Sequence, residues 1–169
     1  MSRVRVGSVE LTHPVMAASG TAGHGAELAA YGELNSIGAV VVKSIAATEW
    51  VGNPAPRVHP IPQGMINAVG LQGLGVQHWI KHDLPAMAAV NATAVVSIWG
   101  QSVDEYQQAA QLLQDGLTRS PHRSTVVAVE VNLSCPNMHG HGIFAHDINM
   151  SAEVIGVCMG LKLPLWAKL

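Results

Sequence analysis

The chain has 169 residues, of which 49% are hydrophobic and 12% are charged, and its formal net charge is −2. This length allows one domain with a real core, and the composition is typical of a compact protein rather than a disordered one. Lysines and arginines are scattered, and there are only two tyrosines and one phenylalanine for base stacking. We therefore do not expect a nucleic-acid-binding protein.

No targeting or membrane segment is predicted. The N-terminal stretch MSRVRVGSVELTHP lacks the long apolar core of a signal peptide. No apolar run reaches the roughly 18 residues that a membrane helix needs. The two cysteines, Cys135 and Cys158, are too few for a disulfide framework. We therefore expect one cytoplasmic domain over residues 1–169, without a membrane partner.

Short β-rich runs alternate with longer segments of helical pattern. Strands are predicted at residues 14–20, 39–45, 93–100, 124–134 and 163–169. Helices are predicted at residues 25–38, 75–91 with a bend at Pro85, 102–116 and 147–161. Ser102 and Glu105 have the spacing of a capping box, and Ser151 is the expected cap of the last helix. The Pro- and Gly-rich stretch 49–75 cannot be one helix.

Continuous apolar strands separated by helices indicate an α/β fold with a parallel sheet that is buried on both faces. A doubly wound sheet and a (β/α)8 barrel both fit this pattern. Five strands would complete a flavodoxin-like sheet, but the long loop after the second strand is unusual there. A barrel normally needs about 250 residues, and this chain has 169.

Polar side chains gather at one kind of place, at or near the carboxyl ends of the apolar strands. They are Ser19, Lys43, Ser97, Asn132 and Lys168. Ligands bind at this end of the strands in both α/β architectures. A lysine that follows an apolar strand needs a partner, and an anionic ligand is one candidate. The alternative is that each lysine reaches solvent at the rim or pairs with Glu49 or Glu130.

Three short motifs carry the candidate chemistry. The glycines of ASGTAGHG (18–25) allow backbone to approach a ligand closely. GMINAVGLQGLG (64–75) places Asn67 among apolar residues, which suits a flat ring, although an ordinary structural loop with a turn-forming Asn is the favoured interpretation of this motif by itself. In NLSCPN (132–137), Asn132 and Asn137 flank a thiol, and amides suit a heterocycle with alternating N–H and C=O groups.

The thiol of Cys135 has three interpretations. A shielded, accessible thiolate can act as a general base, whereas a buried cysteine acts as a small apolar residue. A metal site is the third, because His139, His141 and His146 follow closely. That spacing matches no closed zinc pattern, so no metal is expected. Cys158 lies on an apolar helix and is expected to be structural.

Taken in order, the three motifs resemble those of the dihydroorotate dehydrogenases. PVMAASGTAGHG, VVKSIAATEWVGNPAPRVHPIPQGMINAVGLQGLGV and VEVNLSCPN carry the resemblance, which runs from about residue 4 to the last residue. The chain is most similar to class 1 enzymes, which have cysteine where class 2 enzymes have serine, and CPNMHGHGIFAHD is more similar to the 1B branch. The resemblance implies a (β/α)8 barrel, here about the first five β/α units, with FMN at its mouth.

The implied reaction oxidises (S)-dihydroorotate to orotate in pyrimidine biosynthesis. In the family, a base removes the C5 proton and a hydride leaves C6 for FMN. Cys135 matches the base. The matching substrate-binding residues are Lys43, Asn67, Ala68, Val69, Gly70, Leu71, Asn132 and Asn137. The matching flavin-binding residues are Ser19, Gly20, Lys43, Ser44, Ser97, Asn132 and Lys168. Ser97 departs from the pattern, since relatives often have asparagine there and serine has a shorter reach.

The resemblance also sets expectations for the whole assembly. The sequence stops inside the fifth of eight strands, so we expect the N-terminal part of a longer barrel that by itself is inactive. The 1B similarity implies a partner subunit with FAD and an iron–sulfur cluster that passes electrons to NAD, in a homodimer or heterotetramer. A dihydropyrimidine dehydrogenase-like flavin enzyme and a non-catalytic α/β binding module remain as alternatives.

Overall fold

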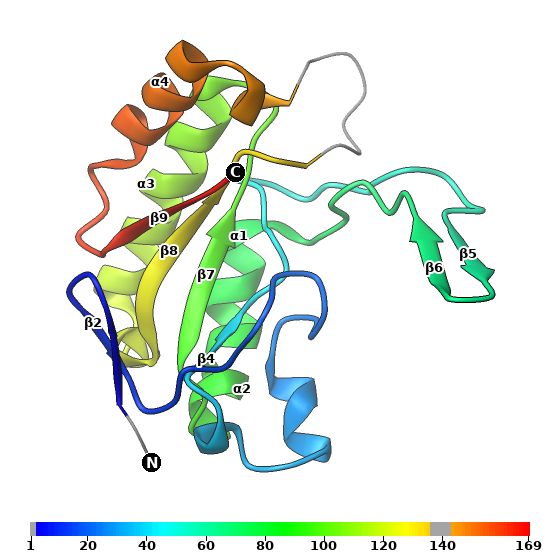
Figure 1. The fold of residues 1–169 in the computed structure, drawn as a ribbon. Coiled ribbons are helices and arrows are strands. Elements are labelled where there is room, and N and C mark those ends of the chain that lie inside the picture. The colour runs from blue at the N-terminus through cyan, green and yellow to red at the C-terminus, as the bar shows by residue number, and fades with distance from the viewer. Residues whose placement is uncertain (1–2, 136–142) are drawn as a thin grey trace.

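A computed structural model describes residues 3–135 and 143–169 and contains one five-stranded parallel sheet (Figure 1). Its strands are β3 Met16–Ala17, β4 Ala39–Val41, β7 Ala94–Ile98, β8 Val126–Asn132 and β9 Leu165–Lys168. They neighbour one another in the order β3-β4-β7-β8-β9, which is also their order along the chain. A doubly wound sheet reverses its order at a switch point. The sequential order is therefore that of a (β/α)8 barrel segment, and the barrel prediction is confirmed.

The helical crossovers pack against one face of the sheet. They are α1 Gly75–His78, a π-helical turn Trp79–Asp83, α2 Leu84–Ala89, α3 Val103–Arg119 and α4 Ile148–Cys158. The larger hydrophobic core joins their apolar side chains to those of alternate strand residues such as Val42, Val96 and Val129. Pro85 lies just after the π-helical turn within a continuous helical run, and it has no backbone N–H to donate to the preceding turn. The predicted bend at Pro85 thus takes the form of a π-helical turn before it.

The opposite face of the sheet is the inner face of the barrel segment, and an N-terminal hairpin covers its lower end. The hairpin consists of β1 Val4–Val6 and β2 Val9–Leu11. Val9 and Leu11 pack against Val41, Val95 and Ala128 in a second, smaller core. Val4, Val6, Val9 and Leu11 alternate around Gly7 and Ser8, which is a hairpin signal that our sequence reading did not use.

One predicted helix is not formed, and the stretch that was predicted not to be one helix contains a hairpin. Residues 25–38 form 3-10 segments at Ala26–Ala30 and Leu34–Ser36 instead of an α-helix. The segment has little apolar surface to bury, since Tyr31 is 90% exposed and Leu34 is the buried residue of the second turn. The stretch 49–75 contains an exposed hairpin, β5 Val58–Ile61 and β6 Gly64–Asn67.

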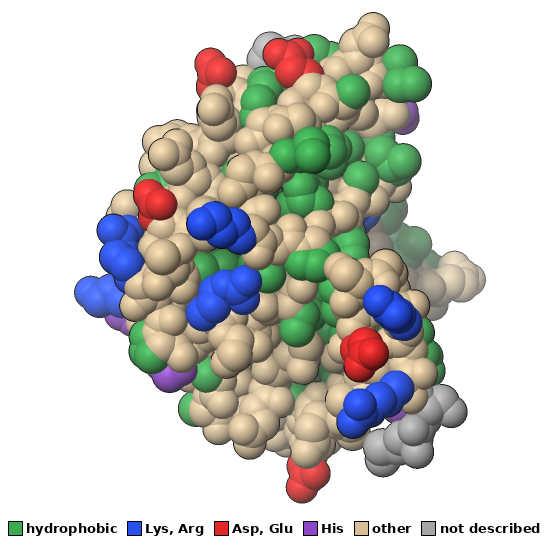
Figure 2. Space-filling view, turned by 90° about the vertical axis from the view of Figure 1, so that its left-hand side faces the viewer, with side chains coloured by type: hydrophobic (Ala, Val, Ile, Leu, Met, Phe, Trp, Pro, Cys, Tyr) green, Lys and Arg blue, Asp and Glu red, His purple; other side chains and the backbone are tan. Residues whose placement is uncertain are grey.

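Figure 2 views the face that carries the edge strand β9, and at its lower right an acidic side chain lies between two basic ones. Figure 2 shows Lys and Arg toward the two sides of this face, with hydrophobic side chains gathered between them. In the described residues, β9 pairs with β8 alone, so its outer edge is unpaired. None of the helices in the described ranges is long and apolar enough to cross a membrane.

The predicted N-cap is confirmed for α3 but not for α4. The Ser102 side chain accepts a hydrogen bond from the Glu105 N–H at the start of α3, as expected. The prediction for α4 was wrong, because Asp147 is its N-cap and accepts from the N–H groups of Asn149 and Met150. Ser151 lies inside the helix and donates to the Phe144 carbonyl.

Replacing Asp147 with alanine is expected to lower the free energy of unfolding by about 1 kcal/mol, the usual cost of removing an N-cap side chain. The physical reason is that two N–H groups at the start of α4 lose their acceptor. Urea denaturation followed by circular dichroism measures the change. Asp104→Ala is the matched control, since Asp104 is an exposed acid inside the first turn of α3 rather than at its cap. Equal losses in the two variants would contradict the assignment of the cap.

Candidate functional site

The inner face of the sheet changes from apolar to polar along the strands. Alternate residues of a strand share one face, and the lower inner positions are Ala39, Val41, Val95, Ala128 and Trp166. Further along β7, β8 and β9, the inner positions are polar or charged. They are Ser97, Glu130, Asn132 and Lys168. The sequence therefore confines polar chemistry to the carboxyl ends of the strands.

Three hydroxyl groups, one carboxylate and one amide join into a hydrogen-bonded network at these strand ends. The Ser97 hydroxyl donates to Glu130 Oε1 at 2.7 Å and lies 2.8 Å from Ser44 Oγ. Asn132 Nδ2 donates to Ser44 Oγ at 3.0 Å, and Ser19 Oγ lies 3.3 Å from the same atom. Ser44, Ser97 and Asn132 are all at most 4% exposed. The structure thus brings together four of the predicted flavin-contacting residues.

The position of Ser97 bears on its predicted role. Its side chain has no exposed surface, and its hydroxyl is engaged by Ser44 and Glu130. This placement argues against a direct contact between Ser97 and a ligand. It favours a role in holding Ser44, which lies nearer to the half-buried Ser19.

Both predicted lysines lie at the end of the inner face, but their surroundings differ. Lys168 Nζ lies 3.3 Å from Glu130 Oε1, so the pairing with Glu130 that we considered for it is present. Lys43 is half-buried and has no ion-pair partner among the described residues. Burial lowers the pKa of Lys43, the charge of Cys135 opposes this lowering, and Lys168 adds to it.

Gly20 allows the chain to pass close to the Lys43 ammonium group. A Cβ atom at Gly20 would lie 3.6 Å from Lys43 Nζ, and the φ angle of Gly20 is +84°. The backbone N–H of Lys43 donates to the Gly23 carbonyl, which ties the first glycine-rich loop to the end of β4. A half-buried cation therefore lies against bare backbone, which is an arrangement suited to an anionic or electron-rich ligand.

The segment that carries Cys135 is anchored at the end of β8. The hydroxyl of Tyr106, a buried residue of α3, donates to the Asn132 carbonyl at 2.6 Å. The Leu133 N–H donates to the Lys168 carbonyl, and the Leu133 carbonyl accepts from Ala145. Cys135 is half-buried and packs at the edge of the larger core. These contacts hold the thiol near the strand ends while leaving part of it accessible.

Cys158 is the second cysteine, and its surroundings confirm a structural role. It has no exposed surface and belongs to the larger core on α4. Burial raises the pKa of the Cys158 thiol to about 11, so it is a neutral thiol at physiological pH.

The predicted substrate loop lies apart from the hydroxyl network. Asn67 is exposed on the β5–β6 hairpin, which projects away from the sheet in Figure 1. Trp50 Nε1 donates to the Gly70 carbonyl and Asn53 Nδ2 to the Ala68 carbonyl. The backbone N–H of Asn53 donates to the Val69 carbonyl, and Leu71 is buried. Among the described residues, the structure does not bring Asn67 beside Ser44 or Asn132.

Several predicted residues lie outside the described part of the chain. Asn137, His139 and His141 belong to residues 136–142. Within residues 3–135 and 143–169, no group of three or more His, Cys, Asp or Glu side chains could hold a metal ion.

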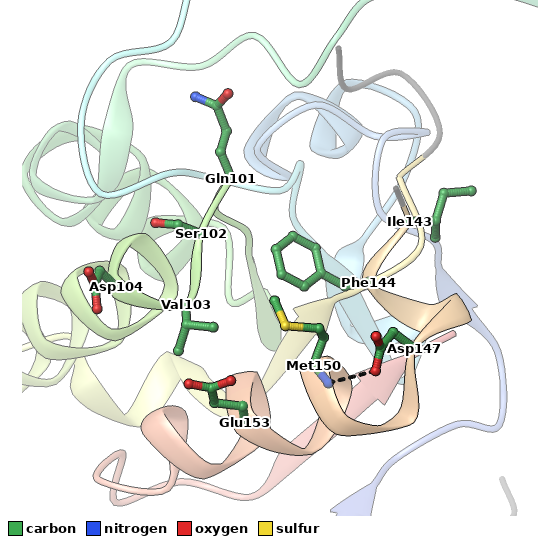
Figure 3. A pocket seen from close by; sticks show the side chains of 9 residues that line it. All are labelled: Gln101, Ser102, Val103, Asp104, Ile143, Phe144, Asp147, Met150 and Glu153. Atoms are coloured by element: carbon green, nitrogen blue, oxygen red, sulfur yellow. Dashed lines mark hydrogen bonds between the residues drawn. The ribbon is translucent and has the colours of Figure 1, made fainter. Parts of the chain in front are cut away.

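A pocket of about 650 Å³ lies on the outer side of the barrel segment, between the first turns of α3 and α4 (Figure 3). Val103, Phe144 and Met150 supply its apolar surface, and Asp104, Asp147 and Glu153 bring three acids around it. None of the predicted site residues lines it, and one of its acids, Asp147, already serves as a helix cap. The pocket is therefore distinct from the polar group on the inner face.

Glu130 is the site residue that sequence reasoning undervalued. It was considered only as a partner for a lysine, yet it connects Ser97 to Lys168. The signal was present, because a carboxylate inside the apolar run VVAVEVN requires partners when the strand is buried.

Comparison with known proteins identifies the family. The sequence model described as Dihydroorotate dehydrogenase matches residues 1–169. Dihydroorotate dehydrogenase B (NAD(+)), catalytic subunit, of Geotalea daltonii is 39% identical over 168 residues, covering 98% of this chain and 53% of the relative. The protein of the same description from Desulforudis audaxviator is 42% identical over 168 residues, covering 98% of this chain and 52% of the relative.

A solved structure shows the same fold. The dihydroorotate dehydrogenase of Eimeria tenella in complex with ferulenol superposes with a TM-score of 0.67 at 19% identity, covering 94% of this chain and 43% of that chain. The chain spans about half the length of the curated relatives it matches. With the family match over all 169 residues and the sequential parallel sheet, the chain belongs to the dihydroorotate dehydrogenase family.

Proposed function

We propose that the protein of which this chain forms part oxidises (S)-dihydroorotate to orotate with FMN, in the cytoplasm, as a step of pyrimidine biosynthesis. The observation that carries the proposal is the half-buried Lys43, which has no ion-pair partner in the described residues and lies beside Gly20 and the Ser44 network. The family supplies the substrate class, and the unpaired cation supplies a reason for an anionic or electron-rich ligand at this place.

The residues at the strand ends fit a flavin. An isoalloxazine ring offers N–H donors and C=O acceptors, and the half-buried Ser19 hydroxyl can bond to one of them. The buried Ser44 and Asn132 would support Ser19 from behind. Lys43 and Lys168 provide positive charge at the same edge of the sheet. FMN, when bound, supplies the acceptor for the hydride that leaves C6 of the substrate. Ser97 then acts behind Ser44 rather than at the ring.

An anion at this site would also stabilise the folded chain, because it would favour the protonated form of the buried Lys43. Burial lowers the pKa of Lys43 below its ordinary value, so the protonated form is less favourable in the folded protein than in the unfolded chain. As the pH falls below that ordinary value of 10.5, the unfolded chain takes up the proton more readily, and the folded state loses stability. A negatively charged group beside Lys43 reverses this effect.

Cys135 is the proposed general base. Its thiol is half-buried at the end of the anchored β8 segment, and its charge acts on Lys43. In the proposed reaction Cys135 Sγ removes the C5 proton of dihydroorotate. Asn132 and Asn137 would orient the pyrimidine ring. Asn67 and residues 68–71 are proposed to line it as well, which requires the β5–β6 hairpin to lie closer to the strand ends than it does in Figure 1.

The descriptions of the relatives support a proposal for the electron acceptor. The relatives from Geotalea daltonii and Desulforudis audaxviator are described as catalytic subunits of dihydroorotate dehydrogenase B (NAD(+)). We therefore extend the proposal to a partner subunit with FAD and an iron–sulfur cluster, which passes electrons to NAD in a heterotetramer built on a catalytic-subunit homodimer.

The test is the visible spectrum of the purified full-length protein, recorded before and after anaerobic addition of dihydroorotate. A flavin spectrum that loses its absorbance near 450 nm is the expected result. Dihydrouracil is the matched control substrate, since it lacks the carboxylate. Bleaching by dihydrouracil alone would indicate a dihydropyrimidine dehydrogenase-like enzyme, and a folded protein without flavin would favour the binding module.

A further inference from the structure

Glu130 lies at the centre of the inner face, between two strands that each bring it a polar partner. In the sheet register Ser97 of β7 is directly opposite Glu130, and Lys168 of β9 is opposite Asn132, one inner position further along. The carboxylate accepts from Ser97 at 2.7 Å and pairs with Lys168 Nζ at 3.3 Å. Its side chain is only 13% exposed.

Burying a carboxylate at this position costs folding free energy. The neighbouring inner positions are Val95 and Ala128 below Glu130 and Trp166 beside it on β9, so an apolar side chain at position 130 would extend the smaller core. Replacing buried ion pairs by apolar residues is often neutral or stabilising. Fold stability alone therefore does not explain why β8 carries a carboxylate here.

The Glu130 carboxylate determines to which partner each hydroxyl in the network donates its hydrogen bond. It only accepts, so the single proton of Ser97 is committed to it. Ser97 must then accept from Ser44, whose own proton is committed in turn. Ser44 Oγ accepts from Asn132 Nδ2, and its remaining lone pair accepts from Ser19. The chain of donors thus runs from Ser19 through Ser44 and Ser97 to Glu130.

The direction of the hydrogen bonds determines what the two ends of the network offer to a ligand. The proton of Ser19 points inward to Ser44, so Ser19 Oγ offers lone pairs to a ligand as an acceptor. At the other end, Glu130 holds the Lys168 ammonium, whose side chain is 36% exposed. A ligand at the strand ends therefore meets an acceptor from β3 and a fixed cation from β9.

We propose that Glu130 is a positioning residue for the flavin: through Ser97 and Ser44 it presents Ser19 as a hydrogen-bond acceptor, and by direct pairing it fixes and partly neutralises Lys168. The proposal rests on the flavin-dependent function proposed above. It adds that a residue which does not touch the flavin sets both the polarity of its hydrogen-bonding partners and the net charge beside it.

The first test is Glu130→Gln in the full-length flavin-containing protein. The amide keeps the size of the side chain but removes its charge and frees Lys168. The dissociation constant of FMN is expected to rise about tenfold or more, which is the scale of a lost charge-assisted hydrogen bond. The reduction potential of the bound flavin is expected to rise, because removing a negative charge favours the electron-rich reduced form.

Two variants separate positioning from a general effect on folding. Glu130→Asp keeps the charge and is expected to keep the reduction potential near that of the native protein. Glu10→Gln removes an exposed carboxylate from β2 and should change neither the FMN affinity nor the potential. A Glu130→Gln protein with native affinity and native potential would overturn the proposal.

A double-mutant cycle tests the hydrogen-bond chain without flavin. Glu130→Gln, Ser97→Ala and the double variant are compared by the thermal unfolding midpoint of the flavin-free protein. Residues in one network give non-additive effects, so the double variant should lose clearly less than the sum of the single losses. Additive losses would overturn the chain. Absence of flavin from the native protein would instead count against the proposed function, and the cycle would still decide whether the hydrogen-bond chain exists.

Discussion

Cys135→Ala is expected to leave FMN bound and to slow reduction of the flavin by dihydroorotate by on the order of 10²-fold or more, which is the usual contribution of a general base. The alanine removes the proton acceptor but leaves Lys43 and the hydroxyl network in place. Anaerobic stopped-flow measurement at 450 nm, on the full-length protein loaded with FMN, isolates this half-reaction from reoxidation of the flavin.

Cys158→Ala is the matched control, because it makes the same change at the other cysteine of the chain. Cys158 lies in the core on α4, so its loss can lower stability but should leave the rate of flavin reduction unchanged. Native rates in Cys135→Ala would show that another group takes the proton. Cys135→Ser is less decisive, since related enzymes use serine as the base.

The parallel sheet could be predicted because its signal is local and strong. AVVVKSI and TAVVSIWG are short apolar runs between helical segments, and both contain strands of the predicted sheet. The choice between a doubly wound sheet and a barrel could not be made from these patterns. It depends on which strands become neighbours, and periodicity within one segment carries no information on its partners.

For the site, the location could be predicted from the sequence, but the identity of the groups that face a ligand could not. A polar residue at the end of an apolar strand must lie at the carboxyl edge of a parallel sheet, which is why the predicted Ser97, Asn132 and Lys168 all lie at this edge. Which polar groups face a ligand and which lie behind them depends on register. Ser97 lies behind because it is directly opposite Glu130, and that alignment is a property of two strands far apart in the sequence.

The segment between β4 and α1 shows a different limit. Its prolines and glycines exclude one long helix, but they do not indicate that residues 58–67 form a hairpin with exposed Met65 and Ile66. Exposed apolar side chains contradict the rule that apolar alternation indicates burial. The position of Asn67 therefore could not be inferred from its apolar neighbours.

Gly75→Ala is expected to lower the free energy of unfolding by about 2–4 kcal/mol, a large share of the 5–15 kcal/mol of a typical domain. Gly75 opens α1 with a φ angle of +84°, and a non-glycine residue in this region costs roughly 1–3 kcal/mol. A Cβ atom would also lie 2.7 Å from the Thr48 carbonyl carbon and 3.0 Å from its Cα. The neighbouring Val76 N–H donates to the Ala46 carbonyl, so α1 cannot move away without losing this bond.

Gly64→Ala is the matched control for Gly75→Ala. Gly64 lies on the exposed β5–β6 hairpin, it does not have a positive φ angle, and a Cβ atom there meets nothing within 4 Å. Its substitution should change the unfolding free energy by no more than about 0.5 kcal/mol. Urea denaturation followed by tryptophan fluorescence reports both changes, since Trp79 is buried in the turn after α1. Similar losses in the two variants would contradict the prediction, because they would mean that the contact between Gly75 and Thr48 does not constrain the start of α1. The backbone between the predicted substrate loop and α1 could then shift to accept a side chain at position 75.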